Sequence, residues 1–242
     1  MIELANVSKR FGSTAAVRNV SFRANPGRVT AFLGPNGAGK TTTLRLILGL
    51  DKPTQGTVLV DGRRYAERRA PAHDVGALLD GTAAHPRRRA RDHLRWIAAS
   101  NGIAPQRVDA VLELVGLADV ARRRAGTFSL GMKQRLGIAA ALLGDPAVLM
   151  FDEPLNGLDP AGIRWARALM RELAGQGKTV LVSSHMMSEM AQVADHALVI
   201  ARGRIIADGP LPSLSQPGES LEDAFLRLTE HDTDFVASER TR

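Results

Sequence analysis

The stretch Gly34-Pro35-Asn36-Gly37-Ala38-Gly39-Lys40-Thr41 separates two glycines by four residues and follows them with a lysine and a hydroxyl residue. This is the phosphate-binding loop pattern. The apolar run at 29–33 before it predicts a buried strand, and apolar residues at helical spacing follow it at 44–48. A loop between a strand and a helix is the context that the pattern requires, so the sequence predicts a nucleotide site.

The chemistry of this loop follows from its backbone. Glycines allow positive φ angles and close approach, so successive N–H groups converge on phosphate oxygens, and the helix N-terminus adds positive potential. The phosphates are therefore expected to contact the loop residues Gly34, Pro35, Asn36, Gly37, Ala38 and Gly39. Lys40 is expected to reach the β- and γ-phosphates, and Thr41 or Thr42 to hold Mg²⁺. The alternative, a chance glycine-rich turn, does not explain the flanking strand and helix.

Length and composition limit the other possibilities. A chain of 242 residues fits one large domain, or a core with an inserted subdomain. The absence of cysteine excludes disulfides and thiolate metal sites. The longest apolar runs, at 138–143 and 147–151, fall far short of the roughly 18 residues that span a bilayer. No leader peptide is visible, so we expect a soluble chain.

The formal net charge of +7 comes mostly from arginines in runs at 63–64, 68–69, 87–91 and 122–124. A basic excess is compatible with binding to nucleic acid or to a membrane surface. No aromatic residue interleaves these runs, as a base-stacking platform would require. A solvated surface is therefore the favoured interpretation, and no nucleic-acid partner is expected.

The apolar patterns predict an α/β chain. Antiparallel strands are expected in residues 1–30, and further strands are expected at 57–60, 75–79, 148–151, 179–183 and 197–207, the last a hairpin. Helices are expected at 41–50, at 108–115, from Ser129 onward, at 160–173 after the N-cap Asp159, and at 221–228. The arrangement predicts one domain over 1–229 with a helical insertion at about 86–145, and a flexible tail at 230–242.

An acidic pair provides the second sign of chemistry. The apolar strand expected at 148–151 ends in Asp152 and Glu153. In a parallel α/β sheet ligands bind at that end of the strands. One carboxylate can orient the Mg²⁺ shell and the next can polarise a water that attacks a γ-phosphate. An isolated acidic pair is usually a turn or a cap, but the phosphate loop favours the catalytic interpretation.

The third sign is Phe128-Ser129-Leu130-Gly131-Met132-Lys133-Gln134-Arg135. It resembles the Leu-Ser-Gly-Gly-Gln signature of the nucleotide-binding subunits of ATP-binding cassette (ABC) transporters, keeping Ser129 and Gly131 and departing at Leu130 and Met132. Without the family, Ser129 is an ordinary helix cap. The resemblance extends over residues 1–229 and implies a P-loop NTPase (RecA-like) core, an N-terminal antiparallel β subdomain and an inserted α-helical subdomain.

The resemblance also implies roles for single residues. Phe11 matches the aromatic residue that stacks on adenine, although a strand-end aromatic is a fair alternative. Asp80 stands where most of the family has a glutamine that joins the Mg²⁺ site to the helical subdomain; a turn aspartate is the alternative. Asp159 belongs to a segment that crosses the dimer interface. His185, after the strand at 179–183, matches the histidine that holds the γ-phosphate and the attacking water.

The implied activity is ATP hydrolysis with Mg²⁺. Glu153 is the expected general base, Lys40 and His185 stabilise charge on the γ-phosphate, and Thr41, Asp152 and Asp80 form the metal site. Ser129 and Gly131 of one subunit are expected to close the nucleotide site of another. The implied assembly is a homodimer, or a dimer with a related ATPase subunit, bound to an integral membrane permease at the cytoplasmic face of the cell membrane.

Asp80 and the closing segment 220–226 resemble the branch that exports drugs, antibiotics and bacteriocins, which favours export. The alternative function is a cytosolic ATPase of the same superfamily that acts on nucleic acid or ribosomes. Such proteins generally carry tandem cassettes or a long coiled coil, which this chain lacks. An unrelated phosphate-loop kinase or GTPase would not explain Ser129, Gly131 and His185.

Overall fold

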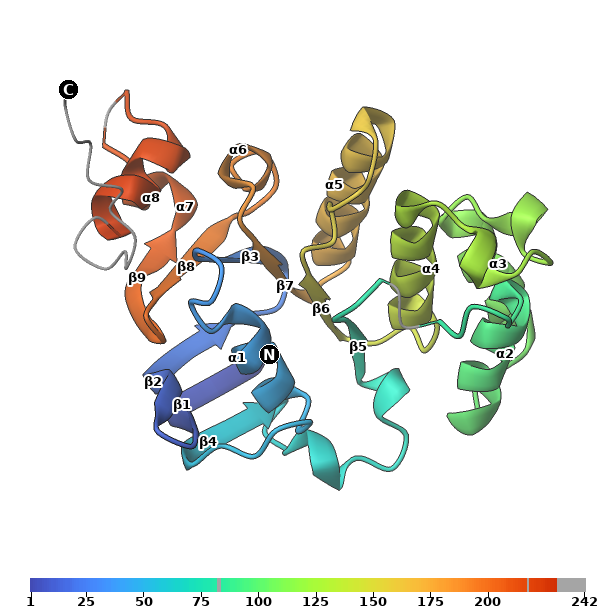
Figure 1. The fold of residues 1–242 in the computed structure, drawn as a ribbon, viewed down its shortest axis with the longest axis horizontal. Helices are drawn as coiled ribbons and strands as arrows, with labels where there is room; N and C mark the ends of the chain where they lie inside the picture. The colour runs from blue at the N-terminus through green and yellow to red at the C-terminus, as the bar shows by residue number, and fades with distance from the viewer. Residues whose placement is uncertain (82–83, 217, 230–242) are drawn as a thin grey trace.

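The computed structural model describes residues 1–81, 84–216 and 218–229. It contains a three-stranded sheet of order β2-β1-β4 and a six-stranded sheet of order β5-β6-β7-β3-β8-β9 (Figure 1). The strands are β1 (Ile2–Phe11), β2 (Thr14–Ala24), β3 (Arg28–Leu33), β4 (Gln55–Val60), β5 (Val75–Leu78), β6 (Val148–Asp152), β7 (Thr179–Ser184), β8 (His196–Ala201) and β9 (Arg204–Pro210).

The large sheet is buried on both faces. Strands β5, β6, β7, β3 and β8 pair in parallel, and β9 adds to β8 in antiparallel orientation. Along β3, Ala31 and Leu33 pack into one apolar cluster, while Phe32 between them packs into the other. Such strands are continuous apolar runs because successive side chains alternate between two covered faces. The parallel order brings the carboxyl ends of β3, β6 and β7 to one edge.

Helices and the small sheet cover those faces. Helix α1 (Lys40–Ile47) lies between the two sheets, and α5 (Pro160–Gly175) covers the opposite face with α4 (Leu130–Leu142). Helices α2 (Ala90–Ser100) and α3 (Gln106–Leu114) pack beside α4 at the right of Figure 1. The C-terminal side holds α6 (Met187–Met190), α7 (Leu211–Leu214) and α8 (Leu221–Thr229). Among the described helices, none is long and apolar enough to cross a bilayer.

This architecture confirms the predicted fold class: an α/β core, an antiparallel sheet and helices inserted between β5 and β6. Helices α2, α3 and α4 all fall within the expected insertion at 86–145. The predicted tail at 230–242 lies outside the described residues. Two boundaries were wrong by three residues: α1 ends at Ile47 and not at Leu50, and β9 ends at Pro210 and not at Ala207.

The early end of α1 has a local cause. Gly49 adopts a left-handed φ of +63°, and its N–H donates to the Leu46 carbonyl at 3.1 Å. The N–H of Leu50 donates to the Arg45 carbonyl at 3.0 Å. These two bonds form a Schellman motif, which satisfies the last carbonyls and reverses the chain.

Close approach of α4 to β5 fixes the helical insertion against the core. A Cβ added to Gly76 on β5 would lie 1.9 Å from the backbone oxygen of Ala141 on α4. A clash with backbone cannot be relieved by rotating a side chain, so strand and helix must separate. Contact at this distance therefore depends on the absence of a side chain at Gly76.

We predict that Gly76→Ala lowers the free energy of unfolding by about 2 kcal/mol or more, the range of overpacked cores. Urea denaturation measures it. The control is Gly175→Ala at the end of α5, where an added Cβ meets no atom within 4 Å. Equal stability of the two variants would contradict the proposed close contact.

Candidate functional site

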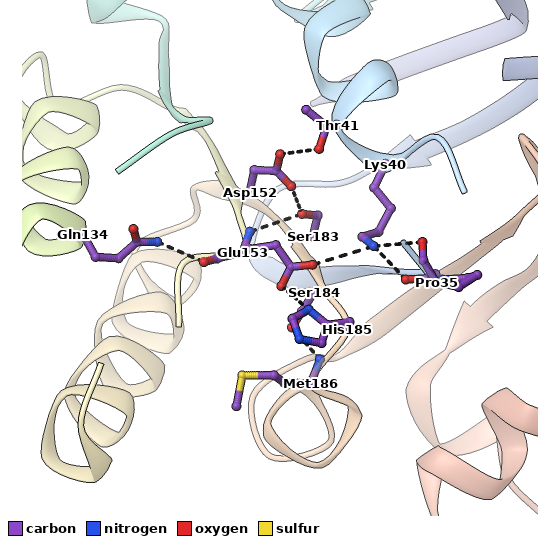
Figure 2. Close-up of polar contacts among 11 residues, drawn as sticks. Pro35, Lys40, Thr41, Gln134, Asp152, Glu153, Ser183, Ser184, His185 and Met186 are labelled. Carbon is purple, nitrogen blue, oxygen red and sulfur yellow. Dashed lines mark hydrogen bonds and ion pairs between the residues drawn. The ribbon is translucent and has the colours of Figure 1, made fainter. Parts of the chain in front are cut away.

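The predicted phosphate loop and acidic pair meet at the carboxyl edge of the large sheet. The loop connects β3 to α1, and β6 and β7 end beside it (Figure 2). These segments enclose a cavity of about 210 Å³. Its lining residues are Ala16, Pro35, Asn36, Gly37, Gly39, Lys40, Thr41, Thr42, Asp152 and Glu153.

The loop needs glycine at its closest contacts. Gly37 and Gly39 have φ angles of +79° and +108°, and a side chain at Gly39 would place its Cβ 2.7 Å from the backbone oxygen of Ala16. A φ of +108° is essentially restricted to glycine. Backbone N–H groups of the loop and of the first turn of α1 can therefore line the cavity, as an anion-binding concavity requires.

Lys40 supplies a buried positive charge. Its side chain is nearly buried, and Nζ donates to the carbonyls of Gly34 at 2.7 Å and Pro35 at 3.3 Å. Nζ also lies 3.7 Å from Oε1 of Glu153. Burial lowers the pKa of Lys40 below its ordinary value, and the nearby Glu153 and Asp152 carboxylates oppose that effect. A cation in this position complements polyphosphate charge.

Asp152 joins three elements of the site. Its Oδ2 accepts a hydrogen bond of 2.6 Å from Thr41 Oγ1 at the start of α1. Its Oδ1 accepts a hydrogen bond from Ser183 Oγ on β7. A carboxylate beside a hydroxyl provides the hard oxygen ligands that Mg²⁺ prefers. The oxygen atoms of Thr41 and Asp152 are therefore suitable ligands for the predicted Mg²⁺ ion.

Glu153 adopts an unusual backbone conformation. Its φ is +49°, in the left-handed region that non-glycine residues rarely occupy. Its N–H donates to the Ser183 carbonyl at 3.1 Å. Its carboxylate Oε2 lies 2.8 Å from Nδ1 of His185, which follows β7 (Figure 2). The predicted base and the predicted histidine are thus direct neighbours.

Ser183 is a site residue that the sequence reasoning missed. Its hydroxyl donates to Asp152, and both its hydroxyl and its carbonyl accept from the N–H of Glu153, so it holds the two acidic residues together. The available signal was a serine near the end of a predicted buried strand, two residues before His185.

Eight of the predicted residues are not among the described lining of this cavity. Gly34 and Ala38 belong to the loop itself and His185 contacts Glu153, whereas the other five lie on other segments. Phe11 ends β1 with half of its surface exposed, and Lys9 Nζ lies 4.8 Å from its ring centroid. Ser129 caps α4, its Oγ accepting from the Met132 N–H at 3.2 Å. Gly131 follows in the first turn of α4.

The remaining two are Asp159 and Asp80. Asp159 caps α5, where its Oδ1 accepts from the Gly162 N–H at 2.8 Å, as the sequence predicts. Asp80 follows β5 and lines a different cavity, of about 560 Å³. We refer to this second cavity as the groove.

The groove lies between the core and the helical insertion. One wall comes from Leu50 and Tyr65 of the core, and the other from α2 and α4. Leu50 and Trp96 leave more than half of their surface exposed. Burial, with a contribution from Arg88, lowers the pKa of His93, so this imidazole in the groove is neutral at pH 7. The groove is therefore mainly apolar, with the carboxyl group of Asp80 among its lining residues.

Two arginine runs form one surface near this groove. Arg89 and Arg124 are paired in an antiparallel β-bridge, so the runs at 87–91 and 122–124 lie side by side. The guanidinium carbon of Arg88 lies 5.1 Å from the Trp96 ring centroid. Within the described ranges, Arg91 is the one residue of these runs with an ion-pair partner, Asp109 at 3.0 Å. The surface is thus strongly basic beside the groove.

The family model described as ABC transporter matches residues 17–156, which contain the phosphate loop, Ser129 and the acidic pair. The chain belongs to the ABC transporter family. The ABC ATPase assignment agrees with the strand–loop–helix geometry, the buried lysine and the paired carboxylates, and it identifies the chain as an ATP-binding, ATP-hydrolysing subunit.

Curated relatives of this ABC ATPase are named for transport. It is 39% identical to the bacitracin transport ATP-binding protein BcrA of Bacillus licheniformis, over 89% of this chain and 72% of the relative. It is 34% identical to the lantibiotic transport ATP-binding protein SrtF of Streptococcus pyogenes, over 93% of this chain and 96% of the relative. These names do not indicate the alternative of an ATPase acting on nucleic acid.

Solved structures show the same fold. An ATP-binding subunit of an ABC transporter superposes with a TM-score of 0.86 at 28% identity, covering 95% of this chain and 99% of the other. A bacterial ABC transporter cassette solved as a dimer superposes with a TM-score of 0.81 at 25% identity, covering 87% and 99%. The likeness extends over nearly the whole length of both cassettes.

The geometry of the loop predicts that Gly39→Ala abolishes measurable ATP binding in isothermal titration calorimetry, because the clash with Ala16 moves the loop backbone. The matched control is Gly12→Ala, which also replaces a glycine of positive φ, +57°, but meets no atom within 4 Å. Residual left-handed strain in the control costs about 1 kcal/mol of stability. Normal ATP affinity in Gly39→Ala would refute the assigned loop geometry.

Proposed function

We propose that this ABC ATPase hydrolyses ATP to energise export through a separate membrane permease. The observation that supports it most directly is the cluster of Lys40, Glu153 and His185, in which a buried cation, a carboxylate and an imidazole lie within hydrogen-bond or ion-pair distance. Export is supported by relatives named for bacitracin and lantibiotic transport, and by Asp80 and segment 220–226, which resemble that branch.

In this proposal Glu153 is the general base that accepts a proton from the attacking water. Phosphoryl transfer depends mainly on positioning and on stabilisation of charge at the γ-phosphate. An ionised carboxylate only accepts hydrogen bonds, so Nδ1 of His185 carries the proton shared with Oε2 of Glu153. In that tautomer Nε2 is an acceptor, so it can take a hydrogen bond from the attacking water, and it can donate to the γ-phosphate only as an imidazolium. Lys40 holds its positive charge at the opposite side of Glu153.

The metal role is assigned to Thr41 and Asp152, with Asp80 as an outer contributor. The hydrogen bond between Thr41 and Asp152 fixes two hard oxygen atoms at the mouth of the loop. Mg²⁺, when bound, neutralises phosphate charge and orients the β- and γ-phosphates. Ser183 keeps the Asp152 carboxylate in place through its second oxygen.

The site is proposed to require two copies of the chain, or one copy and a related ATPase subunit. Ser129 and Gly131 do not line the cavity of their own copy in the described structure, yet Ser129 is exposed at the N-terminus of a 13-residue helix. A helix N-terminus with a capping hydroxyl is suited to a phosphate. The solved dimer of a similar cassette supports this assembly. Phe11, exposed at a strand end, is assigned to the adenine, and Asp159 to the interface.

The groove is the proposed docking site of the permease. Its occupant would be a cytoplasmic segment of the membrane subunit that buries apolar side chains against Leu50 and Trp96. The arginine surface beside Trp96 favours acidic residues on that segment. This contact would hold the ATPase at the cytoplasmic face of the cell membrane.

Glu153→Gln is expected to bind ATP and form the dimer while hydrolysing ATP at least 100-fold more slowly, the usual contribution of a general base. Phosphate release and size-exclusion chromatography with ATP measure the two properties. The exposed Glu113 on α3 provides the control, as Glu113→Gln. Wild-type turnover by Glu153→Gln would remove Glu153 from its role.

Trp96→Glu is expected to abolish co-purification with the permease while leaving ATP hydrolysis by the isolated subunit within twofold, because it places a charge in the apolar groove. The permease is the multi-span membrane protein that co-purifies with the wild-type chain. Leu226→Glu, equally exposed on α8, is the control. Retention of the permease by Trp96→Glu would place docking elsewhere.

A further inference from the structure

Gln134 is a buried polar residue that none of the roles above uses. It lies on α4, five residues after Ser129, with only 5% of its surface exposed. Its Nε2 donates a 2.9 Å hydrogen bond to the backbone carbonyl of Glu153 (Figure 2). The helix that begins at Ser129 is therefore bonded directly to the peptide of the proposed base. A buried amide is strongly oriented, because any position without its partner leaves it unpaired.

The bond from Gln134 acts on a strained backbone. Glu153 has a positive φ, a conformation that persists only where the surroundings over-determine it. Its N–H is held by Ser183, and its carbonyl accepts from Gln134 and, at 3.2 Å, from the N–H of Asn156. The direction of the Glu153 side chain depends on this conformation, because the carboxylate must reach His185 on one side and Lys40 on the other.

The opposite side of Gln134 touches the segment after β5. A Cβ added to Gly81 would lie 2.1 Å from Oε1 of Gln134, so the glutamine amide packs directly on the Gly81 backbone. Gly81 follows Asp80, and both line the groove. A single side chain thus spans from the wall of the groove to the carbonyl of Glu153.

We propose that Gln134 is a positioning residue that sets the orientation of Glu153 and links it to the groove. This link rests on the proposed function. Movement of the segment at Asp80 and Gly81 shifts the side-chain amide of Gln134, and this amide in turn shifts the backbone peptide of Glu153. Hydrolysis then responds to the permease segment in the groove through one hydrogen bond. The Asn156 bond keeps the turn folded when Gln134 is changed, so the effect falls on turnover and not on folding.

The first test measures steady-state ATP hydrolysis by the full chain. Gln134→Met keeps the length and volume of the side chain and removes the donor, and Gln134→Ala removes both. We expect kcat to fall about tenfold in each, the effect of losing one hydrogen bond that orients the base, with KM for ATP within twofold of wild type. The exposed Gln176→Ala on the far end of α5 is the control.

The second test is a double-mutant cycle with Gly81→Ala, whose Cβ must displace the Gln134 amide. We expect Gly81→Ala to lower kcat in the wild-type background and to have little further effect in Gln134→Ala. Thermal unfolding of all four proteins separates this from instability. Additive losses, or a kcat loss that follows the loss of stability, would overturn the link.

The proposal and the function on which it rests fail in different ways. An inactive Glu153→Gln together with wild-type kcat in both Gln134 variants would overturn the positioning role and leave the base in place. Normal turnover by Glu153→Gln would overturn the proposed chemistry itself. A rise in KM without a change in kcat would show that Gln134 acts on nucleotide binding, which also contradicts the proposal.

Discussion

The site depends on the two hydrogen bonds that Asp152 accepts, one from Thr41 and one from Ser183. These bonds tie together the start of α1, the end of β6 and the end of β7. Strands β3, β6 and β7 run in parallel, and β3 leads through the phosphate loop into α1. Their carboxyl ends therefore meet at one edge of the sheet without any long loop. The phosphate loop therefore meets an acidic pair and a histidine that lie more than 100 residues later in the sequence.

A second constraint connects this edge to the helical insertion. Gly76 on β5 and Gly81 just after it have no side chains, so the backbone of α4 can approach them closely. These contacts hold α4 against the core. Helix α4 follows its N-cap Ser129, which is not among the described residues that line its own cavity, and it carries Gln134, which donates to the carbonyl of Glu153. The same helix thus carries the element proposed to act on a second copy and the element bonded to the base of its own copy.

The sequence was sufficient for the fold class, because the phosphate loop and the apolar runs each have a local pattern. Gly34 and Lys40 could be predicted as site residues for the same reason, whereas the prediction for His185 came from the family resemblance. The hydrogen bonds of Ser183 and Gln134 could not, since a serine in a strand and a glutamine in a helix have no distinctive pattern until the fold places them beside Glu153. The end of α1 was missed because a Schellman motif depends on the φ angle of Gly49.

The groove and the arginine surface also could not be predicted from the sequence. The sequence contains several arginine runs, but only the Arg89–Arg124 bridge shows that those at 87–91 and 122–124 form one surface. Asp80 was predicted for the metal site from resemblance alone. In the structure it lines the groove, while Thr41 and Asp152 meet at the nucleotide cavity. The contribution of Asp80 to the metal site stays a prediction.

We propose that one copy of the chain holds only part of an ATPase site. Mixing two inactive variants tests it most directly. In a mixed dimer, Lys40→Ala supplies an intact Ser129, and Ser129→Arg supplies an intact phosphate loop, so one complete site is restored. We predict that each variant alone is inactive and that the mixture hydrolyses ATP. Full activity of Ser129→Arg alone, or mixed dimers that remain inactive, would contradict the claim.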